Sequence, residues 1–170
     1  MNPPEPQHPC VERTIALIYE AFDGVTREGG VSLTEAELLD GRPTDEELEA
    51  ARLEDKDQRW QELIDGTHGV DFSADLYFAY LDPIGFRYYL APAMVAALRY
   101  GYDNGIDFWL DVNPEEPGES SLERISLLTN EQSQTVCEYL KCAMLARSRP
   151  EVGAVVAYQF HWAALDQNPI

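Results

Sequence analysis

The sequence predicts a mainly α-helical protein, a single compact domain with short capped helices and long acidic loops. Five segments begin with a helix-start signal, either a Ser/Thr-x-x-Glu/Gln capping box or the pair Asp-Pro. Few segments show the alternation of apolar and polar residues that is typical of strands. The 170 residues, of which 45% are hydrophobic, are enough to bury one core without help from metal ions or disulfides.

The N-terminal end combines a proline-rich tail with a first amphipathic helix. Four prolines fall in the first nine residues, so we expect residues 1–10 to form a disordered tail and residues 11–170 to form one helical domain. The tail also lacks the basic and apolar regions of a signal peptide. The segment 11–22 is expected to be helical because apolar residues recur at steps of three and four. This stripe consists of Val11, Ile15, Ile18 and Phe22.

Two short helices are expected next. The capping boxes that begin at Ser32 and Thr44 predict helices at about 34–40 and 45–55, because the hydroxyl and the later carboxylate satisfy each other's backbone N–H groups. The second of these helices is polar on most sides. It has only Leu48 and Leu53 as apolar anchors, so we expect it to lie on the surface.

The later helices follow from the same signals. Asp82-Pro83 predicts a helix start, and Pro92 is expected to kink or restart that helix, giving a second one at about 91–101. An acidic loop is expected over residues 103–118. Capping boxes at Ser120 and Thr129 predict two more helices. Residues 152–165 could form a buried helix or a strand, and their length and alanine content favour a helix.

The densest cluster of aromatic residues, residues 77–92, is one candidate site. Arg87 lies among tyrosines, and a guanidinium beside phenol hydroxyls could hold a carboxylate or a phosphate. The alternative is structural: Asp82 caps a helix, Arg87 satisfies a nearby acceptor, and the aromatic rings belong to the core. The candidate ligand-binding residues are Arg87, Tyr88, Tyr89, Asp82 and Trp60.

The same segment resembles an uncharacterised bacterial family, known as a domain of unknown function. Its members carry a motif of the form L-D-P-x-G-F-R-Y-Y-L, which this chain matches from Leu81 to Leu90. Trp60 upstream and Ala21-Phe22 at the end of the first helix extend the resemblance. Proline follows the motif one position later than in the family pattern. The resemblance implies a family and brings no activity or catalytic residue with it.

The net charge is −19, from 12 Lys+Arg and 31 Asp+Glu. A chain this acidic is repelled by phosphate backbones and anionic lipid surfaces, so we expect no direct binding to nucleic acid or membranes. Residues 28–75 carry a net charge of −11 and residues 103–131 a net charge of −7, on either side of a nearly neutral centre. The two acidic regions serve either solubility or the attraction of a basic partner.

The cysteines and histidines give no sign of a metal or a cofactor. Cys10, Cys137 and Cys142 form no C-x-x-C pair, so we expect three thiols and a reducing, cytoplasmic setting. His68 has aspartates nearby in the sequence but lacks the spacing of known metal-binding motifs. The longest uncharged stretches, residues 88–98 and 152–165, are too short to span a membrane.

Two functions remain open. The preferred one is a non-enzymatic interaction module, such as an inhibitor, an immunity-type protein or a regulator, that binds a basic protein through its acidic surfaces. The alternative is a small-molecule-binding or enzyme-like domain with an anion site at Arg87 and its neighbouring tyrosines. The candidate partner-binding residues are Asp45, Glu46, Glu49, Asp55, Asp107 and Asp111.

Overall fold

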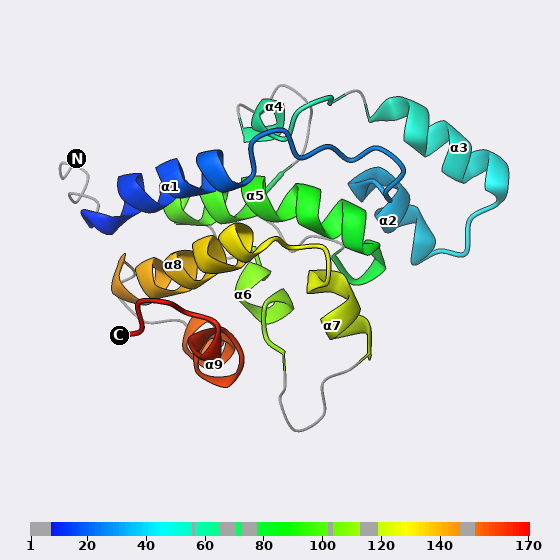
Figure 1. Ribbon diagram of the computed structural model, residues 1–170. Helices are drawn as coiled ribbons and strands as arrows, with labels where there is room; N and C mark the ends of the chain where they lie inside the picture. The colour runs from blue at the N-terminus through cyan, green and yellow to red at the C-terminus, as the bar shows by residue number, and fades with distance from the viewer. Residues whose placement is uncertain are drawn as a thin grey trace, which may run out of the picture.

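Helices pack around one long central helix, as Figure 1 shows. The computed structural model describes residues 8–55, 57–64, 71–72, 78–101, 104–112, 119–146 and 152–170. Its elements are α1 (Cys10–Ala21), α2 (Leu33–Leu39), α3 (Asp45–Glu54), α4 (Gln61–Ile64), η1 (Phe78–Tyr80), α5 (Pro83–Tyr100), α6 (Ile106–Trp109), α7 (Glu119–Ile125), α8 (Asn130–Ala146), α9 (Val152–Phe160) and η2 (Trp162–Ala164). The mainly α-helical fold class is confirmed.

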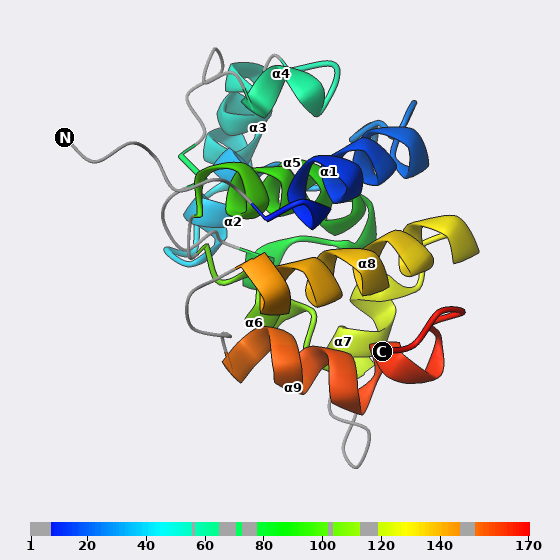
Figure 2. The ribbon, with the colours of Figure 1, turned by 90° about the vertical axis from the view of Figure 1, so that its left-hand side faces the viewer.

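The core lies between α1, α5 and α8. Helix α1 packs most extensively on α8 and also contacts α5, while α9 lies along the other side of α8 (Figure 2). The predicted stripe from Val11 to Phe22 is fully buried in this core, because its spacing places all four side chains on one helix face. Residues 152–160 form a helix, as their composition favoured.

Helix α5 continues through Pro92, so the expected restart near residue 91 is wrong. It runs for 18 residues and ends at Gly101, which adopts the left-handed conformation typical of a helix end. Proline removes one backbone hydrogen bond from a helix interior. Every residue from Tyr88 to Leu98 is buried, and this packing holds the helix together across the missing bond.

Most of the predicted helix starts are confirmed. The hydroxyls of Ser32, Thr44 and Thr129 accept from the backbone N–H three residues later, and Asp82 accepts from Gly85 N at 2.8 Å. The start at Ser120 is wrong. Helix α7 already includes Glu119, which places Ser120 inside the helix rather than at its cap.

The prediction of three free thiols is wrong, because Cys10 and Cys142 form a disulfide between α1 and α8. The two cysteines are 132 positions apart, and only the packing of α1 on α8 brings them together. Cys137 is the buried free cysteine. Disulfides persist mainly in oxidising compartments, so the cysteines no longer argue for a cytoplasmic setting.

Among the described residues, no helix has both the length and the apolar character that crossing a membrane requires.

Candidate functional site

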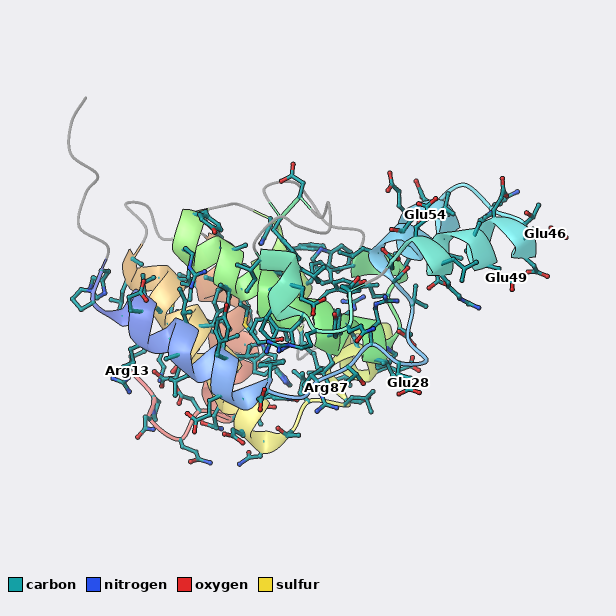
Figure 3. All side chains as sticks on the ribbon, turned by 90° about the horizontal axis from the view of Figure 1, so that it is seen from above. Arg13, Glu28, Glu46, Glu49, Glu54 and Arg87 are labelled. Atoms are coloured by element: carbon teal, nitrogen blue, oxygen red, sulfur yellow. A yellow bond between two sulfur atoms is a disulfide. The ribbon has the colours of Figure 1, made fainter. Side chains whose placement is uncertain are left out.

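Helix α3 is an arm that extends away from the helix bundle (Figures 1 and 3). Among the described elements it packs mainly on α2, and Ala51 is its one buried residue. The prediction of a surface helix is therefore confirmed. The capping box of Thr44 and Glu47 starts the helix, and the hydrogen bonds from the Thr44 backbone and side chain lower the pKa of the Glu47 carboxyl.

The surface of the α3 arm is acidic and carries an exposed leucine. Figure 3 shows Glu46, Glu49 and Glu54 pointing away from the rest of the protein. Leu53 is 74% exposed. A shallow groove of about 480 Å³ runs along the same helix. It is lined by Asp45, Leu48, Glu49, Arg52 and Leu53.

The arm is joined to the body by contacts to α2. Arg52 Nε donates to Glu35 Oε1, and the Glu35 side chain is only 2% exposed. The other carboxylate oxygen of Glu35 accepts from the backbone N–H of Ser32 at 2.9 Å. Thr34 donates to Asp55 Oδ1 at 2.8 Å, just beyond the end of α3. These contacts fix the base of the arm.

A cleft of about 570 Å³ lies beside this joint, and we call it the basal cleft. Its walls come from the loop before α2 and from the residues that end α3 and follow it. It is lined by Thr26, Arg27, Glu28, Gly29, Gly30, Val31, Arg52, Asp57 and Gln58.

Arg27 is the most enclosed cation of the basal cleft. Its side chain is 14% exposed, and its Nη2 lies 3.6 Å from Asp57 Oδ1 and donates to the carbonyl of Asp55 at 3.3 Å. The guanidinium carbon is 5.9 Å from the centre of the Tyr88 ring, which is within range of a cation–π contact. Its Nε is buried and has no hydrogen-bond partner among the described residues.

Asp57 is a buried acid whose two oxygens are both engaged. Oδ1 faces Arg27, and Oδ2 accepts from the Tyr88 hydroxyl at 2.5 Å. Burial and the hydrogen bond to Asp57 raise the pKa of Tyr88 well above its ordinary value, and burial also raises the pKa of the adjacent Tyr89. Tyr88 and Tyr89 therefore stay neutral at physiological pH.

The predicted ligand-binding residues are not assembled into one site. Tyr88 and Tyr89 are buried, and their rings meet edge to face. Trp60 is fully buried and donates to the carbonyl of Phe22 at 2.9 Å. The indole, like the two phenols, therefore belongs to the core.

The two charged members of that predicted set have structural partners. Arg87 donates through Nε to Gln132 Oε1 at 3.0 Å, which links α5 to the start of α8. Asp82 Oδ1 caps α5 and also accepts from Val31 N at 2.9 Å. The structural reading of this segment, in which Asp82 caps a helix and Arg87 satisfies a nearby acceptor, matches the observed contacts.

The predicted partner-binding acids divide into two groups. Asp45, Glu46 and Glu49 are exposed on the α3 arm, and Asp55 lies at its base. Asp107 was expected in solvent, but it is 5% exposed and accepts from the Tyr139 hydroxyl at 2.8 Å. Its position in α6, which packs on α9, buries it.

Asp111 is also less open than expected for a partner-binding acid. The residue is partly buried, and its Oδ1 has no hydrogen-bond partner in the described part of the chain. The predicted acidic loop extends to residue 118, but residues 113–118 lie outside the described ranges, as does His68. In those ranges, no group of three or more potential metal ligands is present.

Arg27 and Arg52, the cations of the basal cleft, are not among the candidate residues that the sequence predicts. Arg52 is one of only four bases in the strongly acidic segment 28–75, and Arg27 directly precedes that segment. A basic residue in such acidic surroundings usually has a specific acidic partner. The scarcity of basic residues in this segment is therefore the feature of the sequence that could have pointed to Arg52. What brings the two arginines together is the turn of the chain through α2.

The comparison with known proteins identifies a family. The chain matches the family of unknown function DUF6714 over residues 12–165, which extends from α1 to the end of η2. No curated protein and no solved structure matches the chain. Because the match includes the α3 arm, the basal cleft and the helical core, the chain belongs to the family of unknown function DUF6714.

Proposed function

We propose that the protein is an interaction module that binds a basic protein partner through the α3 arm. The observation that carries this proposal is Leu53, a large apolar side chain 74% exposed on a projecting acidic helix. Acidic residues alone would serve solubility equally well. Leu53 lines one groove together with the partly buried Leu48, and this apolar pair among carboxylates, rather than a single exposed leucine, favours a surface that a partner covers.

The groove on the arm defines the chemistry of the partner. Leu48 and Leu53, five positions apart, both line the groove and offer apolar contacts there, and Asp45 and Glu49 lie beside them. A basic amphipathic helix is complementary to this pattern, since its apolar face would cover the leucines and its Lys or Arg side chains would meet the carboxylates. The partner is therefore expected to be basic and helical at its contact.

The proposed partner-binding surface is the α3 arm alone, whereas two acidic surfaces were expected from the sequence. Asp107 is buried against Tyr139, so it is not proposed as a contact for a partner. Long-range attraction from a protein with a net charge of −19 would still raise the rate of association with a basic protein. Specificity would then come from the short apolar contact at Leu53.

The experiment compares two charge-matched variants in binding to a defined probe and to partners captured from host extract. The arm variant carries Glu46→Gln, Glu49→Gln and Leu53→Ser. The control variant carries Glu12→Gln and Glu20→Gln, which remove the same charge from exposed positions on α1. The probe is a synthetic amphipathic helix with leucines on one face and lysines on the other.

We expect the wild type and the control to bind the probe and a basic captured protein, and the arm variant to bind both at least about tenfold more weakly. Binding should also weaken as the salt concentration rises, because the acidic residues are exposed. Equal binding by the arm variant, or binding that does not change with salt, contradicts the proposal. The contact of Arg87 with Gln132 does not support the alternative, a small-molecule site at Arg87.

A further inference from the structure

The basal cleft combines opposite charges in a space suited to a small molecule. Its volume of about 570 Å³ lies within the range of small-ligand sites, roughly 300–1,000 Å³. Arg27 and Arg52 supply two positive charges to its lining, and Glu28 and Asp57 supply two negative ones. The cleft is therefore close to neutral, in a protein that is otherwise strongly acidic.

The positive groups of the cleft have donors to spare. Arg27 Nε is buried without a hydrogen-bond partner in the described residues, although a guanidinium has five N–H donors. Arg52 uses Nε on Glu35, and its two Nη groups make no hydrogen bond or ion pair to a described residue. An arginine pair with unused donors is the arrangement that binds a carboxylate.

The negative groups differ from each other in availability. Both oxygens of Asp57 are already engaged, by Arg27 and by the Tyr88 hydroxyl. Glu28 is exposed at the cleft and forms no ion pair with a described residue. The carboxylate of Glu28 is thus the acceptor that an incoming ammonium group would meet.

The overall charge discriminates between ligand classes. A small anion would have to approach a protein with a net charge of −19, which opposes its binding. A small cation would meet two arginines. A zwitterion carries no net charge, and its two ends match the two kinds of free group in the cleft. We propose that the basal cleft binds a small zwitterion of the α-amino acid class, with its carboxylate at Arg27 and Arg52 and its ammonium group at Glu28.

The walls of the cleft are held in place by the core. A Cβ added at Gly30 would lie 2.7 Å from Ile84 Cγ2, so the loop is packed directly on the start of α5. Val31 N donates to Asp82 at the same place. On the other side, Tyr88 lies beneath Arg27 and binds Asp57. Such a preformed site spends little binding energy on ordering itself.

The test is binding of the common L-amino acids, each offered separately to the full chain and followed by calorimetry. For any that bind, the N-acetyl derivative removes the ammonium charge and the primary amide removes the carboxylate. We expect saturable binding of at least one amino acid, and binding of both derivatives at least about tenfold weaker, since each loses a charge-assisted hydrogen bond.

Two variants at exposed positions locate the site. Arg52→Gln removes a guanidinium that is 63% exposed, and Glu28→Gln removes an exposed carboxylate. Both should weaken amino acid binding about tenfold. Arg13→Gln, at an exposed position of α1 at the far end from the arm in Figure 3, is the matched control and should bind as the wild type does.

Three outcomes would overturn this assignment. They are the absence of saturable binding for every amino acid, equal binding of the N-acetyl derivative, and unchanged binding by both cleft variants. The assignment does not depend on the proposed partner of the α3 arm, because the substitutions of the arm variant leave every residue that lines the basal cleft in place.

Discussion

Arg52 on the exposed α3 arm pairs through its Nε with Glu35, a carboxylate that is almost completely buried in α2. The same carboxylate accepts from Ser32 N and so completes the capping box that starts α2. One buried acid therefore both starts a helix of the body and holds the arm. Arg52 also lines the basal cleft and the groove on the arm, so this pair lies where the two proposed binding surfaces meet.

The first prediction is that Glu35→Gln costs more stability than Arg52→Gln. The amide has no negative charge to accept from both Arg52 and Ser32, so we expect a loss of about 1–3 kcal/mol in the free energy of unfolding. Arg52 is 63% exposed, so water can take its place at the Glu35 carboxylate, and its removal should cost less, about 1 kcal/mol. Urea unfolding of both variants checks this. A larger loss for Arg52→Gln would mean that the arm, rather than the buried cap, supplies the stability.

The local structure of this fold could be predicted from its sequence because the signals are local. The capping boxes at Ser32, Thr44 and Thr129 place the hydroxyl and its partner three residues apart, so one segment contains the whole interaction. Pro92 shows the limit of such signals. Its local effect is to break a helix, but the surrounding burial, which no local pattern reveals, outweighs that effect.

The candidate site could be predicted only in part. The exposed acids of the arm were identified because capping and a lack of apolar residues are visible along one helix. The basal cleft was missed because Arg27 and Asp57 are 30 positions apart in the sequence and meet only after folding. Asp107 looked exposed beside its acidic neighbours, but the hydroxyl of Tyr139, from another helix, makes its burial tolerable.

The second prediction concerns the disulfide between Cys10 and Cys142. Unfolded protein without reductant should show one reactive thiol, that of Cys137, and three after reduction. The crosslink spans 132 positions, so Cys10→Ser should lower the free energy of unfolding by about 3–5 kcal/mol, because the unfolded chain gains freedom.

Urea unfolding and thiol titration measure both effects. Burial raises the pKa of Cys137 to about 12, so this thiol should react only after unfolding. Cys137→Ala is the control, since it removes a thiol and leaves the crosslink. Three thiols in the unreduced, unfolded protein would show that the disulfide does not form.

The third prediction is a loss of stability at alkaline pH. The pKa of Tyr88 in the folded protein is raised, by burial and by the bond to Asp57, above the ordinary value of 10.0. The stabilisation that the neutral Tyr88 phenol gives the folded state is complete below pH 10. It is lost as the pH rises above that value, because the phenol of the unfolded chain ionises first. Tyr89 acts in the same direction. The ionisation of each tyrosine in the unfolded chain should lower the free energy of unfolding by about 1.4 kcal/mol per pH unit above pH 10.

Tyr88→Phe tests the source of this alkaline effect. The variant should lose stability at neutral pH, by about 1–3 kcal/mol, because Asp57 Oδ2 loses its donor. Above pH 10 its unfolding free energy should fall less steeply than that of the wild type. Urea unfolding over a pH series measures both. An unchanged slope would mean that Tyr88 does not couple folding to pH.

The fourth prediction concerns Gly85, in the first turn of α5. A Cβ at this position would collide with the backbone carbonyl oxygen of Val31 and would lie 3.0 Å from Asp82 Oδ1. Alanine normally favours a helix by about 1 kcal/mol relative to glycine. Here the backbone of residue 31 must move, and this strain should exceed the helix preference, so Gly85→Ala should lose about 1–3 kcal/mol.

Gly41→Ala is the matched control for Gly85→Ala. Its Cβ would lie 3.4 Å from the carbonyl oxygen of Leu38, an ordinary contact, so its stability should change by about 0.5 kcal/mol or less. Because Val31 also lines the basal cleft, Gly85→Ala should shift the amide resonances of residues 29–31, whereas Gly41→Ala should not. If Gly85→Ala were as stable as the control, the loop before α2 would be able to move at little cost. This result would contradict the claim that the loop is a preformed wall of the basal cleft.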